Sequence, residues 1–279
     1  MSQAEPIRKL GIIAGSGLLP AQIIESCKAT GRDYFILGIE GHADATLLAN
    51  NPHRMVRLGA VGEALTALRE NQVKDIILAG RVGRPSIASL RPDFTATKLI
   101  ARLGKKIFNG DDSLLKSVIN YLEEEGFNVV SAQDVLQSLI APKSVLTKRK
   151  PTVQELSDIT LGFKAAHALG ALDIGQAVVI ENGYILAVEA AEGTDGLLAR
   201  TAALKQYDAG VGILIKCKKP TQEKRADLPT IGPDTVEVAH KAGLAGIAVE
   251  AGFSIILDQK KLIERADELS LFVIGFAHD

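Results

Sequence analysis

Short apolar segments alternate with helix-like segments along the first half of the chain, and this alternation restricts the fold more than any other sequence feature. The apolar segments predict strands at Leu10–Ala14, Tyr34–Ile39, Met55–Leu58, Asp75–Ala79 and Phe127–Val130. Helical spacing between them predicts helices at Pro20–Ala29, Glu63–Asn71, Thr95–Leu103 and Ser113–Glu125. Strands that are apolar throughout and separated by helices are typical of parallel sheets covered on both faces. We therefore expect an α/β protein that begins with a Rossmann-like parallel-sheet domain.

The region 142–151 interrupts this alternation. It contains two prolines and four basic residues but no acidic residue, a composition typical of a segment between domains. We therefore predict a nucleotide- or phosphate-binding domain at 1–141, a linker at 142–151 and a carboxy-terminal domain at 152–279.

The carboxy-terminal region predicts a second α/β domain with a mixed sheet. Asn182-Gly183 lies between two apolar runs, which favours a tight antiparallel hairpin. Strands separated by helical segments follow it, and these favour parallel pairing. The strands are expected at Ala177–Ile180, Tyr184–Val188, Val211–Ile215, Gly246–Val249, Ser254–Leu257 and Leu271–Phe276.

Composition excludes several classes of protein. The 279 residues are 47% hydrophobic and 23% charged, with a net charge of -1, which excludes a disordered chain and argues against a whole-protein nucleic-acid binder. Cys27 and Cys217 have no second cysteine or histidine at metal-ligand spacing, so we expect reduced thiols in the cytoplasm. No apolar run reaches about 18 residues, so no membrane-spanning helix is expected, while peripheral membrane contact stays open.

A glycine turn, Gly15-Ser16-Gly17, connects the first predicted strand to the first helix. Such a turn exposes backbone N–H groups at a helix N-terminus, which suits a phosphate. The dinucleotide fingerprint requires a third glycine where Pro20 stands, although Glu40 after the second strand could imitate its ribose-binding acid. A tight turn without a ligand explains the same residues equally well.

A second loop, Gly80-Arg81-Val82, follows the fourth predicted strand and opens a basic region. Loops at the carboxyl ends of parallel strands form the binding crevice of open α/β sheets, and arginine suits phosphate contacts. A solvated basic helix face is the alternative.

Two acidic motifs precede predicted helices. Asp111 and Asp112 follow Gly110, and Glu192 and Asp195 belong to the segment Glu189–Gly196. Carboxylates in a loop can bind a hard cation such as Mg²⁺, and helix capping is the simpler explanation.

The segment that follows the strand Val211–Ile215 carries the strongest chemical signal. Lys216 and Lys218 come directly after this strand, and a loop with Arg225 and Asp227 follows. Neighbouring cations keep an aspartate ionised, and such an anion can bind a metal or orient water. A salt bridge at a strand end is the alternative. The nucleophile elbow of serine hydrolases and the P-loop motif are both missing from the sequence.

Together and in this order, the motifs resemble the LpxI-type UDP-2,3-diacylglucosamine pyrophosphatases. No single motif is specific to that family, but their joint occurrence is. The residues that carry the resemblance are Lys9–Pro20, Gly80–Val82, Gly110–Asp112, Glu189–Asp195, Lys216–Pro220, Gln222, Arg225, Asp227 and Pro229–Gly232.

The resemblance implies a Rossmann-like domain, a separate carboxy-terminal domain and a substrate held between them. It implies hydrolysis of UDP-2,3-diacylglucosamine to UMP and 2,3-diacylglucosamine 1-phosphate, a step of lipid A synthesis, with Mg²⁺ or another divalent cation. It also implies attack at the lipid-side phosphorus. The expected location is cytoplasmic, peripheral at the inner membrane of a Gram-negative bacterium. The expected partners are the lipid-linked nucleotide sugar and the membrane surface, with no nucleic acid, and a homodimer stays open.

The resemblance also assigns residues to roles. Asp227 matches the family's key acid and would position or deprotonate water or bind the metal, while Lys216 and Lys218 would offset phosphoryl charge. The expected substrate-binding residues are Gly15, Ser16, Gly17, Gly80, Arg81, Arg225, Thr230 and Gly232. The candidate metal ligands are Asp111, Asp112, Glu192 and Asp195. An NAD-dependent oxidoreductase and a non-catalytic nucleotide-sugar or lipid-binding protein remain as alternatives.

Overall fold

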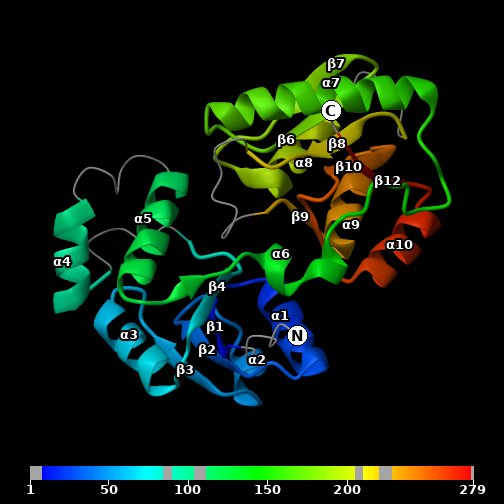
Figure 1. The fold of residues 1–279 in the computed structure, drawn as a ribbon. Coiled ribbons are helices and arrows are strands. Elements are labelled where there is room, and N and C mark those ends of the chain that lie inside the picture. The colour runs from blue at the N-terminus through cyan, green and yellow to red at the C-terminus, as the bar shows by residue number, and fades with distance from the viewer. Residues whose placement is uncertain (1–7, 84–89, 104–110, 205–209, 220–227, 278–279) are drawn as a thin grey trace, which may run out of the picture. The chain divides into compact units, whose positions relative to one another are not determined.

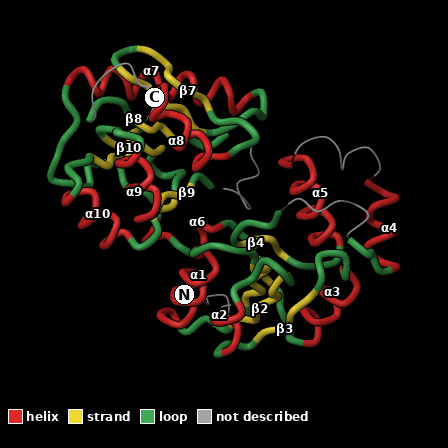
Figure 2. The backbone as a smooth tube through the Cα atoms, turned by 180° about the vertical axis from the view of Figure 1, so that it is seen from behind, coloured by secondary structure: helices red, strands yellow, loops and turns green. Residues whose placement is uncertain are grey.

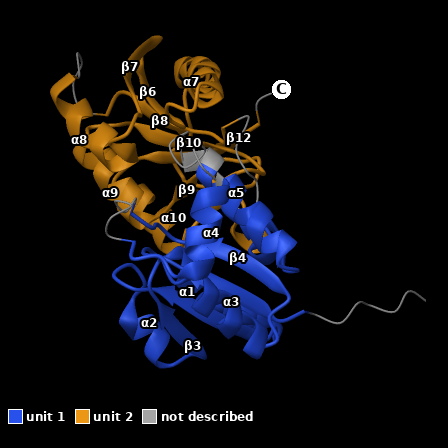
Figure 3. Ribbon diagram, turned by 90° about the vertical axis from the view of Figure 1, so that its left-hand side faces the viewer, with its two compact units in different colours: residues 1–136, 223–226 blue, residues 137–222, 227–279 orange. Residues whose placement is uncertain are grey.

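The computed structural model describes residues 8–83, 90–103, 111–204, 210–219 and 228–277. The chain divides into two compact units, one up to Leu136 and one from Gln137 onward (Figure 3). Each unit contains a five-stranded sheet with helices between its strands (Figures 1 and 2). The predicted α/β class is confirmed.

The sheet of unit 1 is parallel throughout and has the order β3-β2-β1-β4-β5. Its strands are β1 (Leu10–Ala14), β2 (Tyr34–Ile39), β3 (His53–Val56), β4 (Asp75–Ala79) and β5 (Asn128–Val129). The bounds of β1, β2 and β4 match the prediction. β3 lies two residues earlier than predicted, because exposed His53 and Arg54 pair with β2 at this edge although they are not apolar.

Alternating residues of these strands bury both faces of the sheet, as parallel strands require. On one face, Phe35, Leu37 and Ile76 pack with residues of α3 (Val61–Glu70) and α5 (Asp111–Glu124). On the other face, Ile12, Ile36 and Ile77 are completely buried. The remaining helices of unit 1 are α1 (Leu19–Thr30), α2 (Ala45–Ala49), α4 (Phe94–Leu103) and α6 (Ala132–Val135).

The sheet of unit 2 is mixed, as predicted, with the order β12-β10-β8-β6-β7. Strands β8 (Ile213–Lys216), β10 (Gly246–Glu250) and β12 (Phe272–Phe276) are parallel, and β6 (Ala177–Glu181) runs antiparallel to β8. β6 and β7 (Tyr184–Val188) form the hairpin, whose turn has positive φ at Asn182 and Gly183. β9 (Thr230–Ile231) and β11 (Ile255–Ile256) form a separate two-stranded sheet.

One long helix covers one face of the unit 2 sheet, and three helices cover the other. α7 (Val153–Ala171) places Ile159, Phe163 and Ala166 against Val178, Ile215 and other buried strand residues. The opposite face packs on α8 (Gly193–Leu204), α9 (Pro233–Lys241) and α10 (Gln259–Glu268). In the part of the chain that the structure describes, no helix is both long and apolar enough to span a bilayer.

The segment 142–151 lies along β12. Leu146 N donates to Val273 O at 2.9 Å, and Gly275 N donates to Ser144 O at 2.9 Å. Arg149 donates to Ala245 O at 3.0 Å and to Glu155 at 2.7 Å. These contacts fix the segment to the sheet of unit 2.

Candidate functional site

Unit 1 has one topological switch point, between β1 and β4. From β1 the chain proceeds to β2 and β3 on one side of the sheet, whereas β4 and β5 lie on the other side. In open α/β sheets, ligands bind beyond the carboxyl ends of the strands at such a point. The two glycine-containing loops predicted to bind phosphate, Gly15–Gly17 and Gly80–Arg81, both begin there.

Backbone hydrogen bonds join these two loops. Ser16 N donates to Arg81 O at 2.9 Å, and Arg81 N donates back to Ser16 O at 2.9 Å. Glycine permits this approach, because a Cβ on Gly15 would lie 2.4 Å from Arg81 O and one on Gly80 would lie 2.5 Å from Ser16 O. Gly80 also has a φ of +88°, which strains any other residue.

The same bonds limit what the glycine turn can offer an anion. Gly15 N donates to Ala79 O at 2.8 Å, so neither Gly15 nor Ser16 has its N–H directed at a ligand. Gly17 is exposed and lies just before Leu18, the N-cap of α1, whose first N–H groups have no acceptor within the helix. The Arg81 side chain is exposed. An anion would therefore bind at Gly17, the start of α1 and Arg81.

The corresponding edge of unit 2 carries ionisable side chains. Parallel strands β8 and β10 end at Lys216 and Glu250. β7 ends at the same edge, because it runs antiparallel to β6, which itself runs antiparallel to β8. Lys216 is only 6% exposed, and its Nζ donates to Thr230 O at 3.0 Å. Lysine side chains are rarely buried to this extent unless they are paired. The burial of Lys216 is therefore an unusual feature of this edge.

The three lysines in Lys216–Lys219 have different surroundings. Lys218 Nζ lies 4.1 Å above the Phe253 ring, and Lys218 N donates to Glu250 Oε2 at 2.8 Å. Lys219 forms a 2.8 Å ion pair with Asp173. Lys216 is thus the buried member of the group, next to the predicted substrate residue Thr230.

The acidic segment after β7 divides into a buried and an exposed part. Glu189 is buried and accepts hydrogen bonds from Gln176 N and Thr194 Oγ1, both at 2.7 Å. Glu192 is exposed and accepts hydrogen bonds from Arg200. A backbone hydrogen bond at Glu192 itself, followed by those from Arg200, holds the pKa of its carboxyl below the ordinary value. Asp195 lies exposed in the first turn of α8. As a metal ligand, Glu192 would have to share its carboxylate with Arg200.

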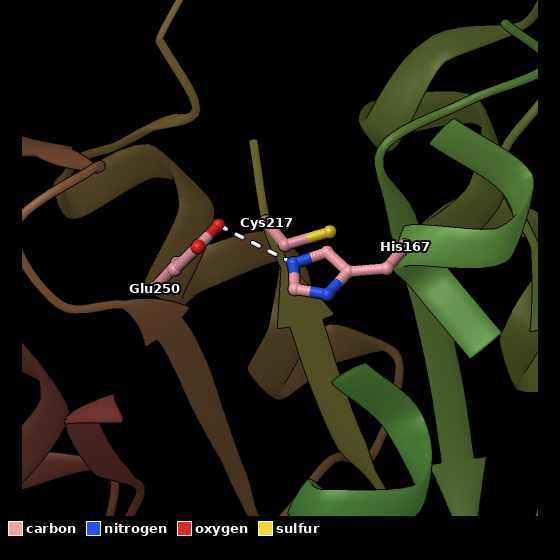
Figure 4. Close-up of side chains that lie close together, drawn as sticks. All are labelled: His167, Cys217 and Glu250. Atoms are coloured by element: carbon pink, nitrogen blue, oxygen red, sulfur yellow. Dashed lines mark ion pairs between the residues drawn. The ribbon is translucent and has the colours of Figure 1, made fainter. Parts of the chain in front are cut away.

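His167, Cys217 and Glu250 form a cluster at this edge that was not predicted from the sequence (Figure 4). Gly162 lets α7 lie close to β8, since a Cβ there would meet Ile215 Cγ1 at 2.5 Å. His167 follows little more than one helical turn later and so reaches Cys217. The sequence did contain one signal for this cluster: Glu250 directly follows a predicted apolar strand. Lys216 was predicted as a site residue from the same kind of position.

Electrostatics differ among the members of the cluster. Burial raises the pKa of the Cys217 thiol to about 12, and the negative charges of Glu250 and Glu189 act in the same direction. Burial also raises the pKa of Glu250, but hydrogen bonds and charges from His167 and Lys218 outweigh it, and the net shift is downward. Glu250 is therefore an anion beside a protonated thiol at neutral pH.

Several predicted site residues lie outside the described part of the chain. They are Arg225, Asp227 and, for their side chains, Asp111 and Asp112. Gly232 is described: it directly precedes α9, and its N–H donates to Thr235 Oγ1 at 3.1 Å.

Comparisons with known proteins cover nearly the whole chain. A family model described as the LpxI N-terminal domain matches residues 9–139, and one described as the LpxI C-terminal domain matches residues 142–274. A relative from Caulobacter vibrioides, named UDP-2,3-diacylglucosamine pyrophosphatase LpxI, is 40% identical over 96% of this chain and 98% of its own length.

A solved structure was also compared, N5-carboxyaminoimidazole synthase from Aspergillus clavatus in complex with ADP and 5-aminoimidazole ribonucleotide. It is 14% identical, with a TM-score of 0.22, over 74% of this chain and 45% of that chain. The present chain thus spans less than half of that protein, and a likeness this weak carries no argument.

Proposed function

The chain belongs to the LpxI family, and we propose that it hydrolyses the pyrophosphate bond of UDP-2,3-diacylglucosamine. Water adds across the bond, and the products are UMP and 2,3-diacylglucosamine 1-phosphate, in a step of lipid A synthesis. The observation that carries this proposal is the near full-length identity of 40% with a relative named for that activity. The oxidoreductase alternative loses its support, because the Gly15 and Ser16 N–H groups donate to β4 and Arg81 rather than toward a ligand.

The two sheet edges contain groups suited to this chemistry. Pyrophosphate cleavage requires neutralisation of the negative charge on the transferred phosphoryl group and a water held in line with the leaving group. Lys216 offers a buried positive charge whose position is fixed by its hydrogen bond to Thr230 O. We assign to Asp227 the orientation or deprotonation of water, and to Gly17 and Arg81 contacts with the nucleotide or pyrophosphate.

We further propose that Mg²⁺ or another divalent cation takes part. Carboxylate oxygen atoms are suitable ligands for a hard cation, and Asp111, Asp112, Glu192, Asp195 and Asp227 are the candidates. The cation would neutralise charge on the pyrophosphate oxygens. Glu192 is the weakest candidate, because Arg200 already binds its carboxylate at 2.9 Å.

The substrate's two acyl chains lead us to propose peripheral binding to the inner membrane. Lys143, Lys148 and Lys150 are exposed and could contact anionic lipid, whereas Arg149 is bound to Glu155 and lies over the Phe272 ring. Replacing the three lysines by glutamate should reduce binding to anionic vesicles in a flotation assay. Unchanged binding would contradict this role.

Sedimentation velocity would test whether the protein forms the homodimer that the sequence leaves open.

UMP release from UDP-2,3-diacylglucosamine, with and without Mg²⁺, tests the proposed function directly. We expect Mg²⁺-dependent release by the wild type and a loss of about 10²- to 10⁴-fold in Asp227→Asn, as for removal of an acid–base group. Asp234→Asn is the matched control, because Asp234 is an exposed acid elsewhere in unit 2. A folded wild type without release, with detergent and metals varied, would favour a non-catalytic binding protein.

Hydrolysis in ¹⁸O-labelled water tests which phosphorus is attacked. We expect the label in 2,3-diacylglucosamine 1-phosphate, as the family resemblance implies. Label in UMP would place the attack at the nucleotide-side phosphorus while leaving the overall reaction intact.

A further inference from the structure

Three potential metal ligands of different chemistry converge at the carboxyl edge of the unit 2 sheet. His167 comes from α7, Cys217 follows β8, and Glu250 ends β10. One ligand atom from each lies within 4.8 Å of the other two, and Figure 4 shows the imidazole paired with the carboxylate and the thiol beside them. The ligands therefore come from elements far apart in sequence that the fold brings together.

The packing around the cluster fixes these groups. Lys218 N donates to Glu250 Oε2 at 2.8 Å, and Cys217 N donates to Gln176 O at 3.0 Å. The Phe163 ring lies against the imidazole, with 6.2 Å between the ring centroids. Such outer contacts orient metal ligands before the ion binds, and so reduce the cost of forming the site.

The cluster combines burial with access from solvent. Cys217 is completely buried, whereas the side chains of His167 and Glu250 are 31% and 14% exposed. The imidazole and the carboxylate are thus partly open to solvent, and the sulfur lies behind them.

A simple ion pair explains only part of this arrangement. His167 Nε2 lies 3.5 Å from Glu250 Oε2, within ion-pair distance. It gives no reason for a thiol at the same place, next to the carboxylate and near the buried Glu189. A cation bonded to the sulfur would offset these negative charges.

We propose that His167, Cys217 and Glu250 form a binding site for Zn²⁺. Imidazole nitrogen, thiolate sulfur and carboxylate oxygen are the ligands that Zn²⁺ uses, whereas Mg²⁺ requires oxygen atoms. Three protein ligands leave the fourth tetrahedral position for water or another ligand. On binding, the sulfur–hydrogen bond of Cys217 breaks, a sulfur–zinc bond forms and the proton leaves to solvent. This site uses none of the carboxylates proposed for Mg²⁺, and it does not depend on the proposed reaction.

Cobalt titration of the metal-free full-length protein tests the site, since Co²⁺ replaces Zn²⁺ and reports a bound thiolate by its charge-transfer absorption. We expect one equivalent of Co²⁺ to give this band in the near ultraviolet, and Zn²⁺ to abolish it. Cys217→Ser should lose the band. Cys27→Ser is the matched control and should keep it, because Cys27 is also a buried thiol but lies in unit 1. No band in the wild type, or an equal band in Cys217→Ser, would overturn the proposal.

Two further variants keep the test decisive if Cys217→Ser does not fold. We expect His167→Gln and Glu250→Gln to weaken Zn²⁺ binding at least tenfold, measured by competition with a chromophoric chelator. Wild-type affinity in both variants would overturn the ligand assignment. Zinc binding should also release the thiol proton at neutral pH, because the thiol is protonated in the metal-free protein, so Cys217→Ser should release fewer protons per ion than the wild type. Equal proton release by the two proteins would exclude Cys217 as a ligand.

Discussion

The carboxyl edges of the two sheets differ in the groups that they present: backbone in unit 1 and ionisable side chains in unit 2. In unit 1, the loops after β1 and β4 meet through backbone hydrogen bonds between Ser16 and Arg81, and glycines allow the approach. In unit 2, the strands end in ionisable side chains, among them the buried Lys216 and the cluster around Glu250. Both edges lie where α/β sheets bind ligands, but among the described residues it is the second edge that holds fixed charges in a buried environment.

In the proposed function, this difference assigns substrate recognition to the edge of unit 1 and the chemical step to the buried groups at the edge of unit 2. Backbone and one exposed arginine can bind an anion, but they supply no group that transfers a proton or carries a buried charge. Buried ionisable groups supply both. The switch-point loops of unit 1 are therefore expected to affect substrate affinity, and the buried charge of unit 2 to affect the rate of the chemical step.

Removal of the buried charge in unit 2 should have the largest effect. Lys216→Met keeps an apolar chain of similar length, and kcat for UMP release should fall about 10²- to 10³-fold, since a preorganised charge near the reacting group is lost. Lys219→Met is the control and should change kcat little, because Lys219 is paired with Asp173. If both variants lose activity equally, the special role of the buried lysine is wrong.

Disruption of the loop contact in unit 1 should mainly affect stability. Gly80→Ala forces a non-glycine residue to φ +88° and places Cβ 2.5 Å from Ser16 O, so we expect a loss of about 3 kcal/mol in urea denaturation. Gly31→Ala is the control, because Gly31 has φ +67° but nothing within 4 Å of the added Cβ. It should lose only about 1 kcal/mol. Equal losses would mean that the close approach of the two loops contributes nothing.

Removal of the exposed cation in unit 1 should change affinity. Arg81→Ala should raise KM about 10- to 100-fold with little change in kcat, which corresponds to about 1.5–3 kcal/mol for hydrogen bonds to a charged group. Arg57→Ala is a suitable control, because Arg57 is an exposed arginine that follows β3, away from the switch point. An unchanged KM would remove Arg81 from the substrate contacts.

The smallest effect concerns the buried thiol of unit 1. Burial raises the pKa of Cys27 above 9.0, although the charge of Arg32 acts against this shift. The unfolded chain therefore loses the thiol proton first as the pH rises. The stability that the protonated thiol contributes is present below pH 9 and decreases above it, by at most about 1.4 kcal/mol per pH unit. Urea denaturation between pH 8 and about 10 should show a shallower decline in Cys27→Ala. Equal slopes would contradict the shift.

The sequence predicted the positions of strands better than it predicted which residues gather at the sites. Apolar runs such as Leu10–Ala14 and Tyr34–Ile39 gave correct bounds, because buried parallel strands are apolar along their whole length. The two-residue strand β9 was missed, since so short a segment has no periodicity. Lys216 could be predicted because a charged residue directly follows an apolar strand. His167 lies within a helix, and nothing in the sequence places that helix next to Cys217. The contact depends on Gly162, which lets α7 lie close to β8.

Kinetics of Lys216→Met and Arg81→Ala, measured in parallel, test the central claim, that the buried charge of unit 2 serves the chemical step and the switch-point loops of unit 1 recognise the substrate. UMP release would be measured over a full range of UDP-2,3-diacylglucosamine concentrations for both folded variants. The account predicts a collapse of kcat in Lys216→Met and a raised KM with near-normal kcat in Arg81→Ala. A collapse of kcat in Arg81→Ala together with normal kcat in Lys216→Met would contradict it.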